Sequence, residues 1–178
     1  MCDLNFYSFM NSSYPLIMMN PLLECALYSY TMETALLHDK LMDLKFKKKD
    51  LHIHRKLYKK DGHIVVHDIK NKKLVNKSEP DHNRNRSVIA CRINVMDIIE
   101  CHNVNTFMQE MGYTYCEELV LDGYKYYKGN LTIDLLKVED KVEYVVHAYL
   151  WTTDLQEGEF ILTNLSNEIS EIIQLTKI

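Results

Sequence analysis

The sequence predicts an α+β protein, a predominantly antiparallel β-barrel of about seven or eight strands with about three helices at its ends. Alternating apolar and polar residues recur along much of the chain, and short turn-forming connections such as Asp122-Gly123 join the alternating segments. Helical spacing of apolar residues appears in fewer places. Short connections make neighbouring strands antiparallel, and so many antiparallel strands in one domain favour a curled or closed sheet.

The chain has 178 residues, a length that fits one domain with its own core. Residues 1–20 show no clear periodicity and contain Pro15, so we predict a partly ordered lead-in there. Residues 21–178 are then predicted to form a single barrel domain. No run of about 18 apolar residues occurs, so we expect no membrane-spanning segment and no membrane partner.

The first structured elements are predicted just after Pro21. The segment LLECALYSY, residues 22–30, is a strand candidate. Residues 31–44 place Met32, Leu36 and other apolar residues near helical spacing, with Thr31 as the N-cap. The domain is therefore expected to begin with a strand followed by a helix.

A β-hairpin is predicted over residues 50–70. Asp61-Gly62 lies at its centre, and Asp-Gly between alternating segments is a strong hairpin signal because both turn residues need positive φ. A two-residue loop would place Tyr58 opposite Val65. The polar residues 71–86 are predicted to form a loop, and residues 87–98 another strand.

The second half of the chain is predicted to contain a helix, four strands and a last helix. The first helix covers residues 101–113, with Asn103 or Asn105 as its N-cap and Gly112 at its C-terminal end. Apolar residues at helical spacing over 159–175 predict an amphipathic C-terminal helix. The four strands are predicted at 113–121, 124–128, 131–138 and 142–152, joined by Asp122-Gly123, Gly129-Asn130 and Glu139-Asp140-Lys141.

The overall charge argues against a nucleic-acid-binding protein. The net charge is −4, whereas such a domain usually carries a basic excess or a basic face. Lysines do gather in the first half of the chain, and we interpret them as solvated strand ends and turns rather than as phosphate contacts. They are Lys45, Lys47, Lys48, Lys49, Lys56, Lys59 and Lys60.

Histidines and cysteines offer the first test for chemistry. No cysteine or carboxylate completes a tetrahedral metal site with the histidines of the predicted hairpin, and lysines share their face. We therefore favour a polar outer face over a zinc site. Cys101-His102 has no identifiable orienting group, so we do not expect a thiol nucleophile there. The hairpin histidines expected on one face are His52, His54, His63 and His67.

A closed antiparallel barrel can also be a metal-dependent phosphohydrolase, and its carboxylates test this alternative. That chemistry needs several Glu or Asp on one face, usually as E-x-E so that both side chains point inward to a divalent ion. The only E-x-E in the chain is Glu157/Glu159, at a predicted loop-to-helix junction. We therefore predict no catalytic residue, metal, cofactor or small-molecule substrate. The strand carboxylates considered are Glu117 and Glu118 on opposite faces, and Asp134 and Glu143, each alone.

Residues 107–129 contain five tyrosines. A turn at Asp122-Gly123 would place four of them on one face with Leu119 and Leu121, and would leave Tyr127 on the other face with Lys125. Base stacking would favour basic residues interleaved with the rings, so we favour a core, then a protein interface, over nucleic-acid binding. The candidates for partner contact are Tyr115, Tyr124, Tyr126, Tyr127 and Trp151.

The order of these features resembles the family of Mediator subunit 18, a subunit of the RNA polymerase II coactivator. The likeness spans the chain from about residue 20 and is most specific over residues 104–138. There a short helix ends in Met111-Gly112-Tyr113, a hairpin pattern follows, and a strand of alternating apolar residues comes next. The positions that carry the last two features are Leu121, Gly123, Tyr126 and Tyr127, then Leu131, Ile133 and Leu135.

The resemblance implies a barrel shaped like the RNA triphosphatase tunnel but without its metal-binding glutamates. It also implies a nuclear, non-enzymatic subunit of the Mediator head module that supports transcription initiation. Its implied partners are Mediator subunit 20, a similar barrel, and a helical segment of Mediator subunit 8, with RNA polymerase II met indirectly. The alternative is a metal-dependent RNA 5′-triphosphatase or polyphosphatase of the same barrel type.

Overall fold

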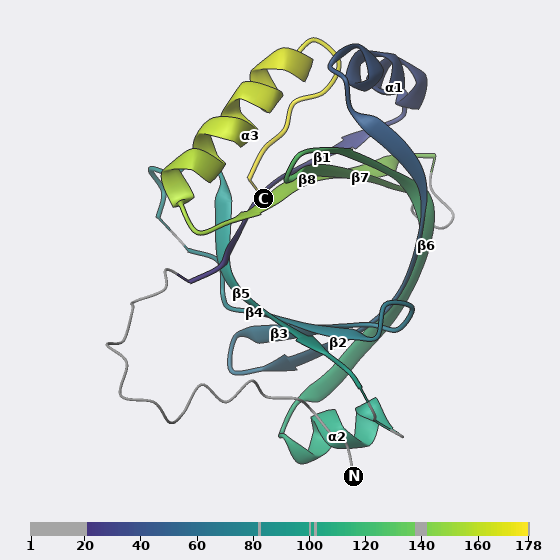
Figure 1. The fold of residues 1–178 in the computed structure, drawn as a ribbon, viewed down its shortest axis with the longest axis vertical. Coiled ribbons are helices and arrows are strands. Elements are labelled where there is room, and N and C mark those ends of the chain that lie inside the picture. Colours follow the sequence, from purple (N-terminus) through teal and green to yellow (C-terminus); the bar gives the residue numbers. More distant parts are fainter. Residues whose placement is uncertain (1–20, 82, 100, 102, 138–141, 178) are drawn as a thin grey trace.

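In the described part of the chain, eight strands close into a barrel and three helices pack outside it (Figure 1). The computed structural model describes residues 21–81, 83–99, 101, 103–137 and 142–177. Around the barrel the strands follow the order β1-β5-β4-β3-β2-β6-β7-β8, and the neighbouring strands pair antiparallel. The predicted fold class is confirmed. No described helix is long and apolar enough to cross a membrane.

Most elements follow one another with short connections, and the longest described one joins β4 to β5. The strands are β1 (Leu23–Thr31), β2 (Lys47–Lys60), β3 (His63–Asp68), β4 (Lys73–Lys77), β5 (Ile89–Asp97), β6 (Thr114–Lys128), β7 (Leu131–Lys137) and β8 (Tyr144–Thr152). The helices are α1 (Thr34–Asp43), α2 (Val104–Glu110) and α3 (Leu155–Ile169). The predicted lead-in over 1–20 and the predicted turn at 139–141 lie outside the described residues.

The predicted loop at 71–86 is wrong in part, because it contains β4. This strand pairs with β3 on one side and with β5 on the other. Asn and Lys are poor strand formers, but hydrogen bonds to two neighbours outweigh a weak local preference. Of its residues, Leu74 is buried against α2, and Val75 points to the opposite face.

The predicted turn at Asp122-Gly123 is also wrong. Strand β6 runs without a turn from Thr114 to Lys128 and pairs with the full length of β2, with one register shift at Leu57/Tyr58. Gly123 serves a close approach, because a Cβ built there would lie 2.0 Å from the carbonyl oxygen of Leu135 on β7. The register shift keeps Tyr113, Tyr115, Tyr124 and Tyr126 on the outer face, as predicted, whereas Leu119 and Leu121 lie on the inner face.

The helix ends are set by capping side chains. Asn103 is the N-cap of α2, as one of the two predicted positions, and accepts from the Thr106 N–H at 3.2 Å. Helix α3 begins earlier than predicted because Asp154 caps it, accepting from the Gln156 and Glu157 N–H groups at 2.9 and 3.2 Å. Thr31 is not a cap but ends β1.

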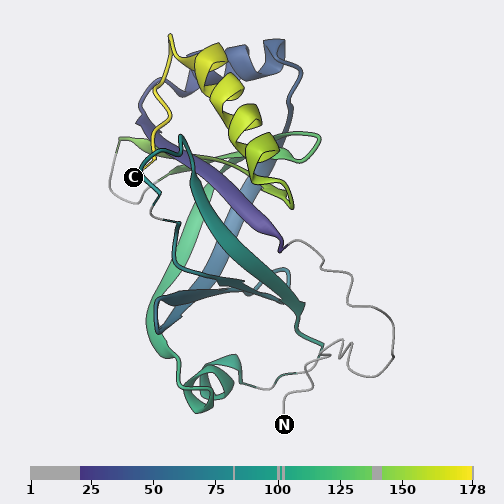
Figure 2. The same cartoon turned by 90° about the vertical axis from the view of Figure 1, so that its left-hand side faces the viewer.

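The main hydrophobic core lies outside the barrel wall. Helices α1 and α3 lie together over one side of the barrel, and Figures 1 and 2 show α2 at the opposite end. Under α1 and α3, alternate residues of β1, β7 and β8 point outward and are buried together with leucines of both helices. This core includes Cys25, Leu27, Leu37, Leu41, Leu131, Ile133, Leu135, Val146, Ala148, Leu150, Leu162, Leu165 and Ile169.

A second, smaller cluster lies under α2. Met108 of this helix packs with Tyr58 of β2, Val65 of β3 and Leu74 of β4, all buried. The Tyr58 hydroxyl donates to the Asn105 side chain, which ties α2 to the wall. Both clusters therefore lie on the outer face of the strands, so the inner face is left to other residues.

Candidate functional site in the barrel lumen

Along each strand, the residues that alternate with the outward core positions point into the barrel. Six strands contribute side chains to one space of about 70 Å³, which only inward-pointing residues of a closed barrel can do. This space is large enough to admit water. Its lining consists of Glu24, Arg55, Val66, Asp68, Val75, Lys77, Asp134, His147, Tyr149 and Trp151.

Each carboxylate among these lining residues has a basic partner. Lys77 Nζ donates to Glu24 Oε1 at 2.6 Å, and Trp151 Nε1 donates to Glu24 Oε2 at 3.1 Å. Lys125 Nζ lies 2.9 Å from Asp134 Oδ1 and donates to the Tyr149 hydroxyl at 2.9 Å. The third pair joins Arg55 Nε and Asp68 Oδ2 at 3.6 Å. The charges of the three pairs cancel.

The protonation states follow from this environment. Burial alone would raise the pKa of the Glu24 carboxyl, but Lys77, His147 and Trp151 together bring it below its ordinary value. Burial lowers the pKa of His147 to about 3, with the nearby lysines and Arg55 acting in the same direction. His147 is therefore neutral at pH 7. Its ring stacks on Tyr28 and Tyr149, with ring centroids 4.6 and 4.5 Å apart.

This lumen does not fit a catalytic divalent ion. Such a site needs carboxylate oxygens free to face the metal, whereas Glu24 and Asp134 face lysines. The residue two positions after Glu24 on β1 is Ala26, and the residues two positions either side of Asp134 on β7 are Thr132 and Leu136. Among the described residues, no group of three His, Cys, Asp or Glu side chains is placed to hold a metal ion.

The predicted strand carboxylates fall mostly elsewhere. Glu118 faces outward and pairs with His54 and Lys56, and Glu143 precedes β8. Asp134 does point inward, and the sequence reading missed that Glu24 and Asp68 join it there. One signal was present: Glu24 is a charged residue in an otherwise apolar strand segment, and such a residue is seldom buried unless it is paired.

The histidine face of the β2–β3 hairpin forms as the predicted pairing requires. Tyr58 pairs with Val65, and His67 lies opposite Lys56. On the adjoining strand β6, carboxylates meet two of these histidines: His52 Nδ1 lies 2.5 Å from Asp122 Oδ1, and His54 Nε2 lies 2.5 Å from Glu118 Oε1. Burial lowers the pKa of His67, with Lys56 adding to the effect. The face is a set of polar side chains, two of which are hydrogen-bonded to carboxylates of β6.

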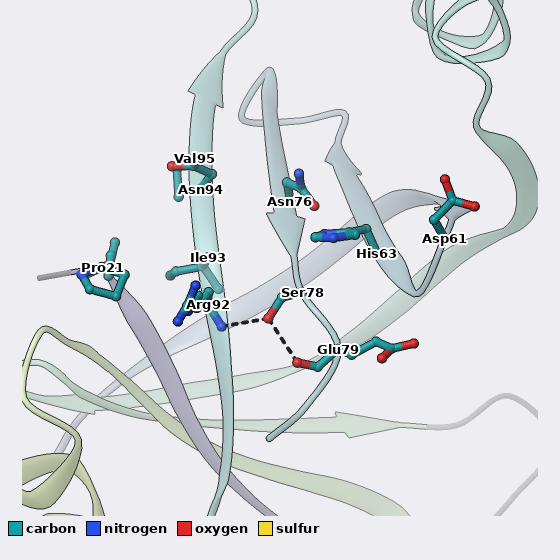
Figure 3. A pocket seen from close by; sticks show the side chains of 11 residues that line it. Pro21, Asp61, His63, Asn76, Ser78, Glu79, Arg92, Ile93, Asn94 and Val95 are labelled. Carbon is teal, nitrogen blue, oxygen red and sulfur yellow. Dashed lines mark hydrogen bonds between the residues drawn. The ribbon is translucent and has the colours of Figure 1, made fainter. Parts of the chain in front are cut away.

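A surface hollow of about 740 Å³ between the β2–β3 turn and β5 has no catalytic arrangement among its lining residues. In Figure 3, the Arg92 N–H donates to Ser78 Oγ, which in turn donates to the Glu79 carbonyl. Ser78 thus links two backbone segments and has no described base beside it.

The five partner-contact candidates lie in different environments. Tyr126 is 1% exposed in the main core, where its hydroxyl lies 3.1 Å from His38 Nδ1, so it cannot meet a partner and leaves the candidate set. Tyr124 is half-buried against the same core. Tyr115 and Trp151 are exposed, and Tyr127 is partly exposed with Lys49 above its ring at 5.8 Å. The four tyrosines predicted on one face share the outer face of the wall, but Glu118, Val120 and Asp122 separate them where Leu119 and Leu121 were expected.

Comparison with known protein families gives a match over most of this barrel. The family model described as Med18 protein matches residues 32–166, from the end of β1 into α3. The chain belongs to the Med18 family. Membership supports a role as a subunit of the Mediator coactivator of transcription. Among curated protein sequences, none is similar enough to count as a relative.

Solved structures share the fold at low sequence identity. A chain of the Schizosaccharomyces pombe Mediator head module matches with a TM-score of 0.66 and 13% identity, covering 88% of this chain and 98% of that one. A Pyrococcus horikoshii protein gives 0.64 and 13%, covering 85% and 94%. A putative adenylyl cyclase from Hippeastrum, described as having a dominant triphosphatase activity, gives 0.51 and 12%, covering 86% and 90%. At these identities the likeness shows the barrel fold alone.

Proposed function

We propose that the chain is a non-enzymatic subunit of the Mediator head module that acts in the nucleus by binding other Mediator subunits. The observation that carries the non-enzymatic part is the pairing of Glu24, Asp68 and Asp134 with Lys77, Arg55 and Lys125. A basic side chain beside each carboxylate offsets the negative charge that a catalytic divalent ion requires from its ligands. Family membership supports the Mediator part.

The proposed partners are Mediator subunit 20 and a helical segment of Mediator subunit 8, with RNA polymerase II met through the assembled head module. Large exposed apolar side chains on one side of the molecule support partner binding. Tyr30 and Met32, at the end of β1, are 56% and 66% exposed, and Leu36 on α1 is 55% exposed. Phe160 on α3 is 68% exposed. Large apolar side chains gathered on one side of a protein are typical of interaction sites.

Co-expression tests the proposal. The chain should co-purify with the subunit 20 and subunit 8 segments of the same organism as a stoichiometric complex in size-exclusion chromatography. A Met32→Asp/Leu36→Asp variant should lose at least one partner because it places charge in the apolar surface. The matched control is Ile64→Asp, which changes a comparably exposed apolar residue on β3. A chain that stays a stable monomer in the presence of both partners would overturn the proposal.

A phosphate-release assay addresses the enzymatic alternative separately. Triphosphorylated RNA and ATP, each with Mn²⁺, should give no release above the level of a Glu24→Ala/Asp134→Ala variant. Release that the intact chain supports and this variant does not would show a lumen that rearranges to bind metal.

A further inference from the structure

Strand β2 has one free edge over its first half. Its pairing with β6 begins at Lys47, but its pairing with β3 begins only at Arg55. The Ile69 N–H donates to the His54 carbonyl at 3.0 Å, and beyond that point toward Lys47 no described residue forms backbone hydrogen bonds with this second edge. About seven residues, Lys47 to Ile53, therefore present a row of unpaired N–H and C=O groups over roughly 23 Å.

Lysines without acidic partners surround this edge. Five exposed lysines have no described carboxylate oxygen within 4.0 Å: Lys45, Lys47, Lys48, Lys49 and Lys128. Three of these lysines instead contact an aromatic ring or a backbone carbonyl. Lys48 Nζ lies 3.8 Å from the centroid of the Tyr124 ring, Lys49 Nζ lies 5.8 Å from that of Tyr127, and Lys128 Nζ donates to the Leu44 carbonyl at 2.9 Å. These contacts position the ammonium groups and leave their charge unneutralised.

In the second half of β2, basic side chains next to the start of the β3 pairing do have acidic partners. There Arg55 pairs with Asp68, and both His54 and Lys56 pair with Glu118. Lys59 and Lys60, at the far end of β2, also lack a described carboxylate partner, but there the strand is paired with β3. Unpaired positive charge and a free strand edge therefore coincide only in the first half of β2, in a chain whose net charge is −4. Lysines on a free edge also stop it from pairing with a second copy of itself, so the same residues repel a like-charged strand and attract an acidic one.

We propose that the free edge of β2, from Lys47 to Ile53, binds an extended acidic segment of a partner protein by strand addition. The main-chain groups of β2 would hold the backbone of the segment, and the lysines would pair with its carboxylates. A hollow of about 390 Å³ adjoins the edge at Asp50, Leu51 and His52 and has Lys70 and Lys137 in its lining, which gives room for one side chain of the segment.

A peptide fits this surface better than a nucleic acid does. The unpaired groups of the edge match a peptide backbone, which offers alternating donors and acceptors, whereas a sugar-phosphate backbone offers acceptors without amide donors. Stacking platforms for bases need open ring faces, but the Lys48 ammonium covers the Tyr124 ring. The negative net charge of the chain also opposes a long polyanion.

The test measures binding of a fluorescein-labelled octapeptide of alternating Glu and Val to the full chain by fluorescence anisotropy. The same peptide with Gln for Glu should bind much more weakly. In the chain, Lys47→Gln/Lys48→Gln/Lys49→Gln should weaken binding by about tenfold, since each exposed ion pair contributes a modest amount. The matched control, Lys59→Gln/Lys60→Gln/Lys72→Gln, removes the same charge from exposed sites away from the free edge and should change binding less than about twofold.

Two N-methylated peptides test the strand addition itself. Methyl groups on alternate amides block one edge of the peptide, so one of the two registers should abolish binding and the other should leave it intact. These peptides leave the chain unchanged, so a poorly folded lysine variant cannot obscure the result. Equal binding of both methylated peptides, an equal loss in the control variant, or tighter binding of a labelled single-stranded oligonucleotide of the same charge would each overturn the proposal.

Discussion

The two faces of the barrel wall differ in how they are stabilised. On β7 and β8, the outward residues, among them Ile133, Leu135 and Val146, are fully buried under the helices. The residues between them, including Asp134 and His147, point into the lumen and contact charged or aromatic groups. The outer face thus buries apolar surface, whereas the inner face holds ion pairs beside space for water.

This difference shows how a tunnel-shaped barrel can remain folded without using its tunnel. Because apolar burial outside the wall supplies the packing, the lumen residues need only cancel one another's charges. A buried ion pair adds little net stability over apolar residues of the same size, but losing one partner is costly. Substitutions on the outer face and in the lumen should therefore change the free energy of unfolding for different physical reasons.

The largest effect is expected from the outer core. Leu162→Ala on α3 removes a fully buried side chain and should lower the free energy of unfolding by about 3–4 kcal/mol. The control is Phe160→Ala on the same helix, a larger side chain that is 68% exposed and should change stability by less than about 0.5 kcal/mol. Urea unfolding followed by circular dichroism measures both. Comparable losses in the two variants would mean that the outer face is not the core.

The next effect concerns the lumen pair of Glu24 and Lys77. Lys77→Met leaves the Glu24 carboxylate buried without its cation and should cost about 3 kcal/mol, the lower end of the range for a broken buried pair because Lys77 keeps some water contact. Adding Glu24→Gln in the same chain should restore most of the loss, since no unpaired charge then remains. If the double variant is no more stable than Lys77→Met alone, the cost was lost packing rather than charge.

A third prediction uses the neutral His147. Its pKa is about 3 in the folded chain and about 6.5 in the unfolded chain, so between these values the unfolded state binds more protons. Stability should therefore fall as the pH is lowered below 6.5, by about 2 kcal/mol between pH 7 and pH 5 from this group. His147→Gln should flatten that slope in urea unfolding, while the exposed His63→Gln should keep it. Glu24, with its lowered pKa, adds a further loss only below about pH 4.5.

The two Asp-Gly dipeptides show which parts of the fold the sequence could predict. Asp61 and Gly62 both take positive φ, at 48° and 76°, and form the predicted turn. Asp122-Gly123 has the same letters but lies in the middle of a strand, because β2 offers a partner along the whole length of β6. Local signals therefore identified most elements, whereas the choice between a turn and a long strand depended on a partner about 70 residues away.

The lumen pairs could not be predicted for a related reason. Glu24 and Lys77 are 53 residues apart and meet because β1 and β4 both pair with β5. Alternation within β1 and β4 gives each residue a face, but not which strands lie beside one another. The free edge of β2 was equally hidden: the lysine run was evident from the sequence, but interpreting it required knowing that β3 ends its pairing at Arg55.

The smallest effect is expected for the ion pairs on the outer surface of β2 and β6. Asp122→Asn removes the partner of His52 while both side chains are largely exposed, at 78% and 51%. Water already solvates such groups, so the free energy of unfolding should change by less than about 1 kcal/mol. The effect should also fade in high salt, because exposed charges are screened while the lumen pairs are not. Measuring Asp122→Asn and Lys77→Met in low and in high salt therefore contrasts the exposed outer pairs with the lumen pairs. A salt-dependent loss for Lys77→Met would show that salt ions reach the Glu24 carboxylate in spite of its burial.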